Sequence, residues 1–245
     1  MSIIFTKSAS TNAVIDQYSL HERAQIIEDV LNFEYGAPFE FFSDKDPLST
    51  LVSAILSHRT KNAVSRRAYL SLTAAFPTWE AVIAAPLEDI TVAIRVATFA
   101  EVKAPRIQEA LRLVRERNHG NLSLAFLSQM SVSAARQWVE KIPGVGAKTS
   151  AAILNFSSLR MPALVVDTHH QRVAQRLGLV PPKATIEKAA KILQNYLPTD
   201  YVGQQVYDNH QGLMRHGQRV CHWQKPECER CVVRTLCEFY QFKQK

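Results

Sequence analysis

The sequence has no long apolar run, little glycine and no cysteine before residue 221. No stretch of about 18 apolar residues occurs, so we expect no membrane-spanning helix and no membrane partner. Glycine accounts for only 8 of the 245 residues, and long alternating apolar and polar segments, the pattern of β-strands, are absent. The first residues lack the basic leader and long apolar core of a secretory signal. We therefore expect a helical, soluble, cytoplasmic protein.

The four cysteines all lie between Cys221 and Cys237. Disulfides of a secreted domain would be spread along the chain, so this clustering points instead to a metal or cluster site. The spacing is Cys221-x6-Cys228-x2-Cys231-x5-Cys237. Four thiolates can hold either tetrahedral zinc or a four-iron cluster. Zinc sites usually show two short cysteine pairs separated by a longer loop, which these gaps do not match.

The composition is that of a globular protein with a basic surface. Hydrophobic residues make up 47% of the chain and charged residues 21%, and the formal net charge is +7. A basic surface gains free energy when it displaces counterions from phosphate, so the charge favours a nucleic-acid partner. Many basic proteins have no such partner, and the charge alone decides nothing.

Apolar residues recur at three- and four-residue spacing along most of the chain, as in amphipathic helices. In the clearest case, residues 101–117, the apolar stripe includes Val102, Ile107 and Val114, and Pro105 is expected in the first turn. Short Gly- and Pro-containing breaks separate the helices. The fold is expected to be all-α, with helices over 22–33, 47–57, 61–75, 87–95, 101–117, 133–141, 147–157, 167–177, 184–196 and 201–215.

Residues 133–157 contain a helix, a stop at Pro143, the turn Gly144-Val145-Gly146 and a second helix. The glycines let backbone N–H groups approach a phosphate, and the helix N-terminus adds partial positive charge. A plain connection between two helices is the alternative. Lys148 lies in the first turn of the second helix, where the helix dipole disfavours the ammonium form. Its amine suits either nucleophilic catalysis or a phosphate contact.

Asp167, in the segment Val165-Val166-Asp167-Thr168-His169-His170, is a second candidate. Asp is also a favoured N-cap, and a cap would fix the position of the carboxylate. His169, His170 and Arg172 are weaker candidates for the pocket or the DNA, since a histidine at the start of a helix is more often a structural hydrogen-bond donor. A solvated helix face is expected for Arg106, Arg112, Arg115 and Arg117.

These segments together resemble the helix–hairpin–helix–GPD superfamily of base excision repair glycosylases, and the endonuclease III family within it, over roughly residues 22–240. The resemblance implies a DNA glycosylase/AP lyase that everts a damaged base, an oxidised pyrimidine, from double-stranded DNA and cleaves the abasic strand by β-elimination. It makes Lys148 the nucleophile that forms a Schiff base, and Asp167 the carboxylate that stabilises the cationic sugar and helps to deprotonate the lysine. It assigns a [4Fe–4S] cluster to Cys221, Cys228, Cys231 and Cys237.

The resemblance also indicates residues that contact DNA. Lys225 stands where the family presents a basic residue to the backbone. Arg59, preceded by His58, stands where the family has a Gln that fills the gap left by the everted nucleotide. An Arg that merely starts the next helix is the alternative. Phe99 falls near the family's Gly-Leu/Tyr wedge, although the match there is loose.

The resemblance implies a two-lobed fold and a monomer associated with the nucleoid through DNA. A helical barrel lobe is expected over 44–160, including the helix–hairpin–helix at 133–157, and an iron–sulfur cluster lobe over 1–43 with 161–245, including the cluster loop 221–237. One alternative is a monofunctional glycosylase for mismatched or alkylated bases, although the adenine glycosylases that share the cysteine spacing generally lack the lysine. Another is a non-catalytic DNA-binding protein, against which Lys148 and Asp167 argue.

Overall fold

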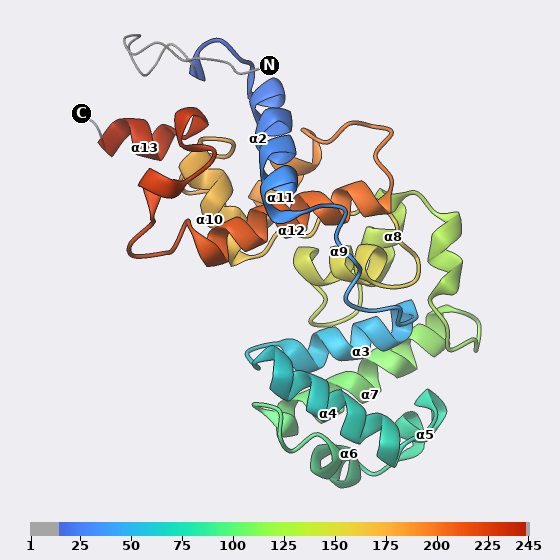
Figure 1. Cartoon of the computed structure of the whole chain (residues 1–245). Helices are drawn as coiled ribbons and strands as arrows, with labels where there is room; N and C mark the ends of the chain where they lie inside the picture. The colour runs from blue at the N-terminus through green and yellow to red at the C-terminus, as the bar shows by residue number, and fades with distance from the viewer. Residues whose placement is uncertain (1–14, 244–245) are drawn as a thin grey trace. The chain divides into compact units, whose positions relative to one another are not determined.

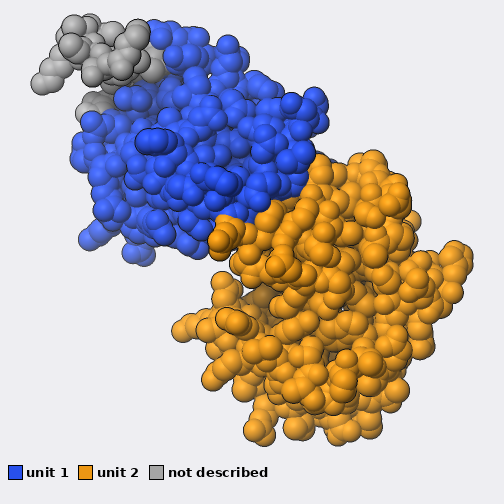
Figure 2. All heavy atoms as spheres, turned by 45° about the vertical axis from the view of Figure 1, so that its right-hand side comes forward, with its two compact units in different colours: residues 1–39, 166–245 blue, residues 40–165 orange. Residues whose placement is uncertain are grey.

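The computed structural model describes residues 15–243, and this part of the chain folds into helices joined by turns, without β-strands (Figure 1). The all-α prediction is confirmed. None of the helices in this range is both long and apolar enough to cross a membrane. The chain divides into two compact units: unit 2 is Glu40–Val165, and unit 1 joins the residues before it to those from Val166 on (Figure 2). The sequence-based lobe boundaries were at 44 and 161.

Unit 2 is built from seven α-helices and one 3-10 helix of the continuous segment 40–165. They are α3 (Pro47–Ser57), α4 (Asn62–Ala75), α5 (Trp79–Ala84), α6 (Leu87–Ala93), α7 (Ala100–Arg117), η1 (Ala125–Gln129), α8 (Val132–Val139) and α9 (Ala147–Phe156).

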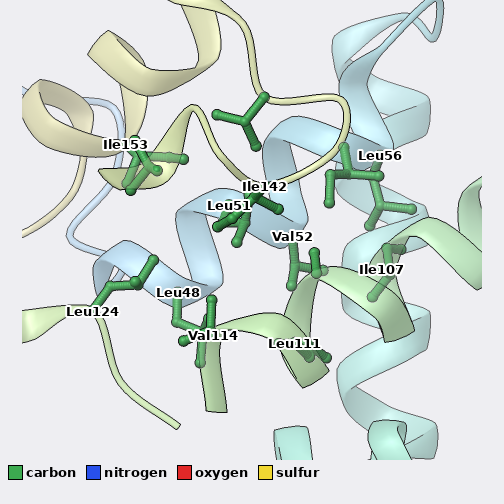
Figure 3. Close-up of a cluster of buried hydrophobic side chains, with 14 of the residues drawn as sticks. Leu48, Leu51, Val52, Leu56, Ile107, Leu111, Val114, Leu124, Ile142 and Ile153 are labelled. Atoms are coloured by element: carbon green, nitrogen blue, oxygen red, sulfur yellow. The ribbon is translucent and has the colours of Figure 1, made fainter. Parts of the chain in front are cut away.

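Helix α3 is at the centre of the unit 2 core and contacts α4, α7 and α9. Its apolar residues, among them Leu51 and Leu56, are fully buried against Ile107 of α7 and Ile153 of α9 (Figure 3). Val102, expected in the apolar stripe of α7, is instead 41% exposed. Pro105 lies in the second turn rather than the first, because α7 begins at Ala100. Three features are therefore anchored to the same core: the hairpin helix α9, the turn between α3 and α4, and the turn before α7.

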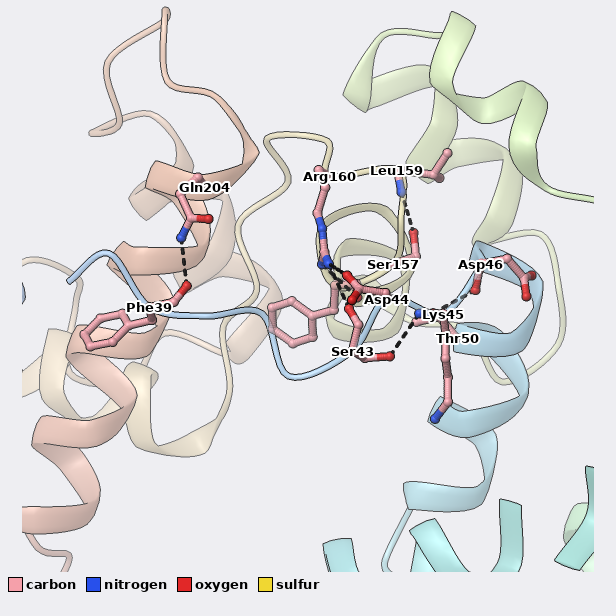
Figure 4. A network of polar contacts seen from close by, with 11 residues as sticks. Phe39, Ser43, Asp44, Lys45, Asp46, Thr50, Ser157, Leu159, Arg160 and Gln204 are labelled. Carbon is pink, nitrogen blue, oxygen red and sulfur yellow. Dashed lines mark hydrogen bonds and ion pairs between the residues drawn. The ribbon is translucent and has the colours of Figure 1, made fainter. Parts of the chain in front are cut away.

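The segment that enters unit 2 is fixed to the segment that leaves it (Figure 4). Arg160 donates to the Ser43 carbonyl at 2.9 Å and forms an ion pair with Asp44 at 2.5 Å. The Asp46 carboxylate caps α3 by accepting from the amides of Leu48 and Ser49. These contacts set the start of α3, and with it the core.

Unit 1 consists of helices from both parts of the chain. Helix α12 contacts both α2 and α10, and Asn209 of α12 donates to the buried carboxylate of Glu28 on α2 at 2.8 Å. Arg23 of α2 donates to the Leu177 carbonyl at the end of α10. The elements are α2 (Leu20–Tyr35), α10 (Thr168–Leu177), α11 (Ile186–Gln194), α12 (Gly203–Arg219), η2 (Cys228–Arg230), η3 (Arg234–Leu236) and α13 (Glu238–Lys243).

All ten expected helices are present, with ends that shift by a few residues. The largest shift is at α12, which runs to Arg219 rather than 215. The short helices α5 and α13 were not predicted, because six residues are too few to show a helical apolar period.

Candidate functional site

The turn between α8 and α9 has the backbone that its glycines predict. Gly144 adopts φ +83°, a left-handed conformation that costs other residues free energy. Val145 is buried, and its amide donates to the Ile142 carbonyl at 3.0 Å, so this residue anchors the turn. Gly146 is the N-cap of α9 and has no side chain with which to cap it. The first amides of α9 have no acceptor within the helix, and so this N-terminus is suited to an anion.

A polar network fixes the direction of α9 relative to α8. Arg136 of α8 donates to the Ala147 carbonyl and to the Ser150 hydroxyl, both at 3.2 Å. Ser150 is fully buried and donates to Glu140 at 2.5 Å. The hairpin is thus held by side chains from both of its helices.

Lys148 is the second residue of α9 and is exposed at the end of the hairpin. Its neighbour Thr149 is buried, and the Thr149 hydroxyl lies 3.4 Å from Nε2 of His58. Burial lowers the pKa of His58, and the positive charges of Lys103, Lys148 and Arg106 lower it further. The side chain of Lys148 therefore extends from a fixed backbone, and its neighbour His58 favours the neutral form.

Asp167 is the N-cap of α10, and its carboxylate accepts from the His170 amide at 2.8 Å. The expected capping role is confirmed, and it gives this half-buried carboxylate a defined position. A carboxylate held in this way can stabilise a nearby positive charge without first being ordered.

The weaker candidates next to Asp167 have structural surroundings. His170 is fully buried beside His210, with ring centroids 5.9 Å apart. Arg172 is buried and donates to the carbonyls of Cys221 and Gly217. Arg172 therefore has a structural hydrogen-bonding role. The arginines of α7 form the expected exposed face: Arg106, Arg112, Arg115 and Arg117.

The four cysteines of unit 1 are free thiols that line one cavity. Apolar side chains, among them Val173, Leu177 and Phe239, complete its wall. Burial raises the pKa of Cys231 to about 11 and that of Cys237 to about 12. Thiolates are therefore disfavoured here unless a bound cation compensates for the lost solvation.

The donor set, four thiols at one cavity, is of the kind that holds either a zinc ion or an iron–sulfur cluster. Tetrahedral zinc, with Zn–S bonds of about 2.3 Å, would bring the sulfurs to within about 4 Å of one another. An iron–sulfur cluster keeps its thiolates further apart, because each binds a different iron.

Arg176 of α10 fixes the loop 222–227 between the first two cysteines. It donates to the carbonyls of His222 and Trp223 at 2.6 and 2.7 Å, and Nη1 lies 3.3 Å from Sγ of Cys221. Lys225 is exposed in this loop, and Trp223 is 71% exposed. The loop is therefore a fixed projection with a positive charge and an aromatic ring on its surface.

The turn after α3 corrects the alternative interpretation of Arg59. Arg59 does not start the next helix, because α4 begins at Asn62. Its exposed side chain extends from left-handed backbone with φ 52°, and Phe99 before α7 is similar, with φ 59° and 48% exposure. His58 is half-buried rather than exposed.

Sequence reasoning missed Lys103 and Thr60, which connect these two turns, and Arg176. Lys103 gave one usable signal: it lies four residues before Ile107 on the buried stripe of α7, where a charge is unexpected. Arg176 follows Arg172 by one helical turn and so shares its face. Nothing in the local sequence marks Thr60.

The helical fold, the glycine hairpin followed by a lysine, and the C-terminal cysteine cavity together define a class of DNA repair enzymes. The model of the HhH-GPD superfamily of base excision DNA repair proteins matches residues 52–199. The chain belongs to this superfamily.

Known proteins of this class are similar over most of the chain. Endonuclease III of Thermotoga maritima is 32% identical over 198 residues, which cover 81% of this chain and 85% of the relative. Endonuclease III of Escherichia coli K12 is 28% identical over 193 residues, with coverage of 79% and 84%. The chain is accordingly a base excision repair enzyme of the DNA glycosylase/lyase class.

Solved structures share the fold. The structure of a trapped endonuclease III–DNA covalent intermediate has a TM-score of 0.75 at 23% identity. The match covers 92% of this chain and 99% of the chain in that structure. A thermostable thymine-DNA glycosylase has a TM-score of 0.73 at 21% identity and covers 90% and 98%. At these identities the likeness establishes the fold alone.

Proposed function

We propose that the enzyme removes an oxidised pyrimidine from double-stranded DNA with Lys148 as its nucleophile, and then cleaves the abasic strand. The observation that carries this proposal is the exposed amine of Lys148 at the start of α9, directly after the glycine turn. A phosphate seated on the uncapped N-terminus of α9 would bring the sugar of the same strand next to this amine. Among the described residues, no other lysine follows such a turn at the start of a helix.

The chemistry follows from an amine at an anomeric carbon. The nitrogen bonds to C1′ while the bond to the base breaks, and the base leaves with the bonding electrons and takes up a proton. Opening of the sugar ring gives an iminium ion. Loss of a C2′ proton then expels the 3′ phosphate, and water finally releases Lys148.

Asp167 supplies the negative charge that these reaction steps need. Positive charge develops on the sugar as the base departs, and an ionised carboxylate stabilises it. A carboxylate can also accept the proton that the lysine must lose before attack. The N-cap bond to the His170 amide holds Asp167 ready for this task.

Borohydride trapping tests Lys148. With abasic-site DNA, the wild type should give a covalent protein–DNA adduct, because borohydride reduces the iminium to a stable amine. Lys148→Ala should give none, whereas Lys141→Ala, a matched change at an exposed lysine, should retain the adduct. An adduct in Lys148→Ala would exclude Lys148 as the nucleophile. Base release by a wild type that forms no adduct would indicate a monofunctional glycosylase.

Asp167→Asn separates binding from chemistry. The amide oxygen can still accept from the His170 amide, so the helix cap and the fold should survive. Binding to abasic DNA should persist while base release is lost. Base release at the wild-type rate would remove Asp167 from the mechanism.

The DNA contacts that we propose come from three turns. The amides at Gly146 and the start of α9 bind a phosphate, and Gly144 and Val145 shape that turn. Lys225 contacts the backbone from the loop 222–227. Arg59, beside His58, fills the gap left by the everted nucleotide. A panel of duplexes, each with one defined lesion, tests the preference for oxidised pyrimidines, because an alkylated base or a mismatch would then be released more slowly.

Cys221, Cys228, Cys231 and Cys237 would hold a [4Fe–4S] cluster. The cluster would supply structure rather than reactivity, since it would fix both ends of the loop that carries Lys225. Purified protein should be brown and contain iron and sulfide, and Cys228→Ser should lose both. Colourless protein with stoichiometric zinc would overturn the assignment.

Unit 1 would then be the iron–sulfur cluster lobe and unit 2 the helical barrel lobe with the helix–hairpin–helix. We propose that the enzyme acts as a monomer in the cytoplasm, on nucleoid DNA. Sedimentation of the protein with and without DNA tests the stoichiometry.

A further inference from the structure

Four residues of unit 2 other than glycine have left-handed backbone, His119 and Arg160 among them, and two of the turns concerned are hydrogen-bonded to each other. These two are the turn after α3, with Arg59 at φ 52°, and the turn before α7, with Phe99 at φ 59°. Such a backbone costs about 1–2 kcal/mol per residue and persists only where its surroundings enforce it. A strained backbone that projects a cation in one turn and an aromatic ring in the other indicates a function for this pair.

The two turns are bonded to each other through Thr60. The Thr60 hydroxyl oxygen accepts from the Thr98 amide at 3.2 Å and from Nζ of Lys103 at 2.7 Å. Thr60 directly follows Arg59, and Thr98 directly precedes Phe99. The hydrogen bond between Thr60 and Thr98 therefore joins the residue after Arg59 to the residue before Phe99.

Lys103 completes this connection from inside the unit. Its ammonium also donates to the Leu56 carbonyl at 2.7 Å, at the end of α3. Carbonyls in the last turn of a helix lack helical donors and carry partial negative charge, which suits a cation. One group thus binds the end of α3, the turn after it and, through Thr60, the turn before α7.

The position of this lysine is unusual. Lys103 is only 3% exposed, and both of these partners are neutral, a carbonyl and a hydroxyl. A buried charge costs stability, and an apolar residue would continue the stripe of α7 at lower cost. A buried ammonium at Lys103 is explained if its hydrogen bonds order the turn after α3 and the turn before α7.

We propose that Lys103 is a positioning residue that presets Arg59 and Phe99 as one rigid pair for insertion into duplex DNA beside an everted nucleotide. This inference rests on the proposed function. Arg59 would bond the orphaned base while the ring of Phe99 stacks in the opened step. Because Lys103 and Thr60 order the turns before DNA arrives, binding loses less conformational entropy.

The test uses a duplex with a tetrahydrofuran abasic analogue opposite 2-aminopurine, whose fluorescence reports the stacking of the orphaned base. Lys103→Met keeps the apolar stem and removes the ammonium, while Thr60→Val removes the shared hydroxyl and leaves the lysine intact. We expect either change to weaken binding to the abasic duplex by about tenfold and to reduce the fluorescence response, with binding to undamaged duplex changed less than about twofold. Lys103→Arg should restore part of both signals.

Arg117→Met is the matched control, since it removes one positive charge from an exposed position on the same helix. It should behave as the wild type. Wild-type affinity and fluorescence in both Lys103→Met and Thr60→Val would overturn the proposal, as would an equal loss of affinity for damaged and undamaged duplex. A wild type that does not prefer the abasic duplex and forms no borohydride adduct would instead refute the proposed function, and this inference with it.

Discussion

Nε2 of His58 and the hydroxyl of Thr149 lie 3.4 Å apart, which connects the turn after α3 to α9, the helix whose second residue is Lys148. Burial, together with three neighbouring cations, lowers the pKa of His58. A histidine whose pKa is lowered on folding binds protons more tightly in the unfolded chain, so stability falls as the pH drops below its unfolded pKa of about 6.5.

His58→Asn should therefore lose less stability than the wild type between about pH 7 and about pH 5. Denaturant unfolding at the two pH values measures this difference. His119→Asn, at an exposed position of the same unit, should keep the wild-type dependence. Identical pH slopes for His58→Asn and the wild type would contradict the neutral state of His58.

Glu28 of α2 predicts the opposite dependence in unit 1. It is 4% exposed, and desolvation raises its pKa to about 7, although the hydrogen bond from Asn209 opposes the shift. A carboxyl whose pKa is raised on folding holds its proton better in the native state, so stability is lost as the pH rises from about 4.5 to about 7.

Glu28→Gln can still accept from Asn209 and has no charge to bury. It should be more stable than the wild type above about pH 7, by up to about 3 kcal/mol, and similar below about pH 4.5. Urea unfolding across this range measures the effect, with exposed Glu34→Gln of the same helix as the control. A constant difference at every pH would show that Glu28 does not titrate in this way.

Gly144 and Gly146 predict different costs for the same substitution. A Cβ would meet no atom within 4 Å at either position, but Gly144 has φ +83° and Gly146 does not have a positive φ. Gly144→Ala should lower the free energy of unfolding by about 1–2 kcal/mol, and Gly146→Ala by less than about 0.5 kcal/mol. Both should weaken DNA binding if the turn approaches a phosphate. Full DNA affinity in Gly146→Ala would contradict that close approach.

The N-cap of α10 predicts a stability difference between two changes at Asp167. Asp167→Ala removes the acceptor of the His170 amide and should cost about 0.5–2 kcal/mol, whereas Asp167→Asn retains it. Thermal unfolding of the two variants measures this difference. If both unfold at the same temperature, the cap does not contribute, and the position of the carboxylate is set by other contacts.

The sequence was sufficient for features that depend on local chemistry. The apolar period located the long helices, and the glycines located the turn before Lys148. Asp167 was recognised as a possible cap because Asp is a favoured N-cap residue and a helix was expected to start there.

Features that depend on distant parts of the chain were not accessible. Thr60 and Lys103 are 43 residues apart, and their hydrogen bond exists only because α3 and α7 share a core. The left-handed backbone at Arg59 and Phe99 also has no local signal, because neither is a residue that favours it. In each case the tertiary fold imposes a conformation that propensity would not choose.

The continuity of unit 2 and the division of unit 1 have a consequence for biosynthesis. Helix α2 packs against α12, whose residues are translated last but for the cysteine segment, whereas unit 2 is complete once Val165 has emerged from the ribosome. Unit 2 can therefore fold while translation continues. Until α12 has been translated, the face of α2 that packs against it stays exposed, and the four cysteines are translated only after the whole of unit 2. Nascent chains stalled just after Val165 has emerged from the ribosome should contain a protease-resistant unit 2 and a protease-sensitive α2.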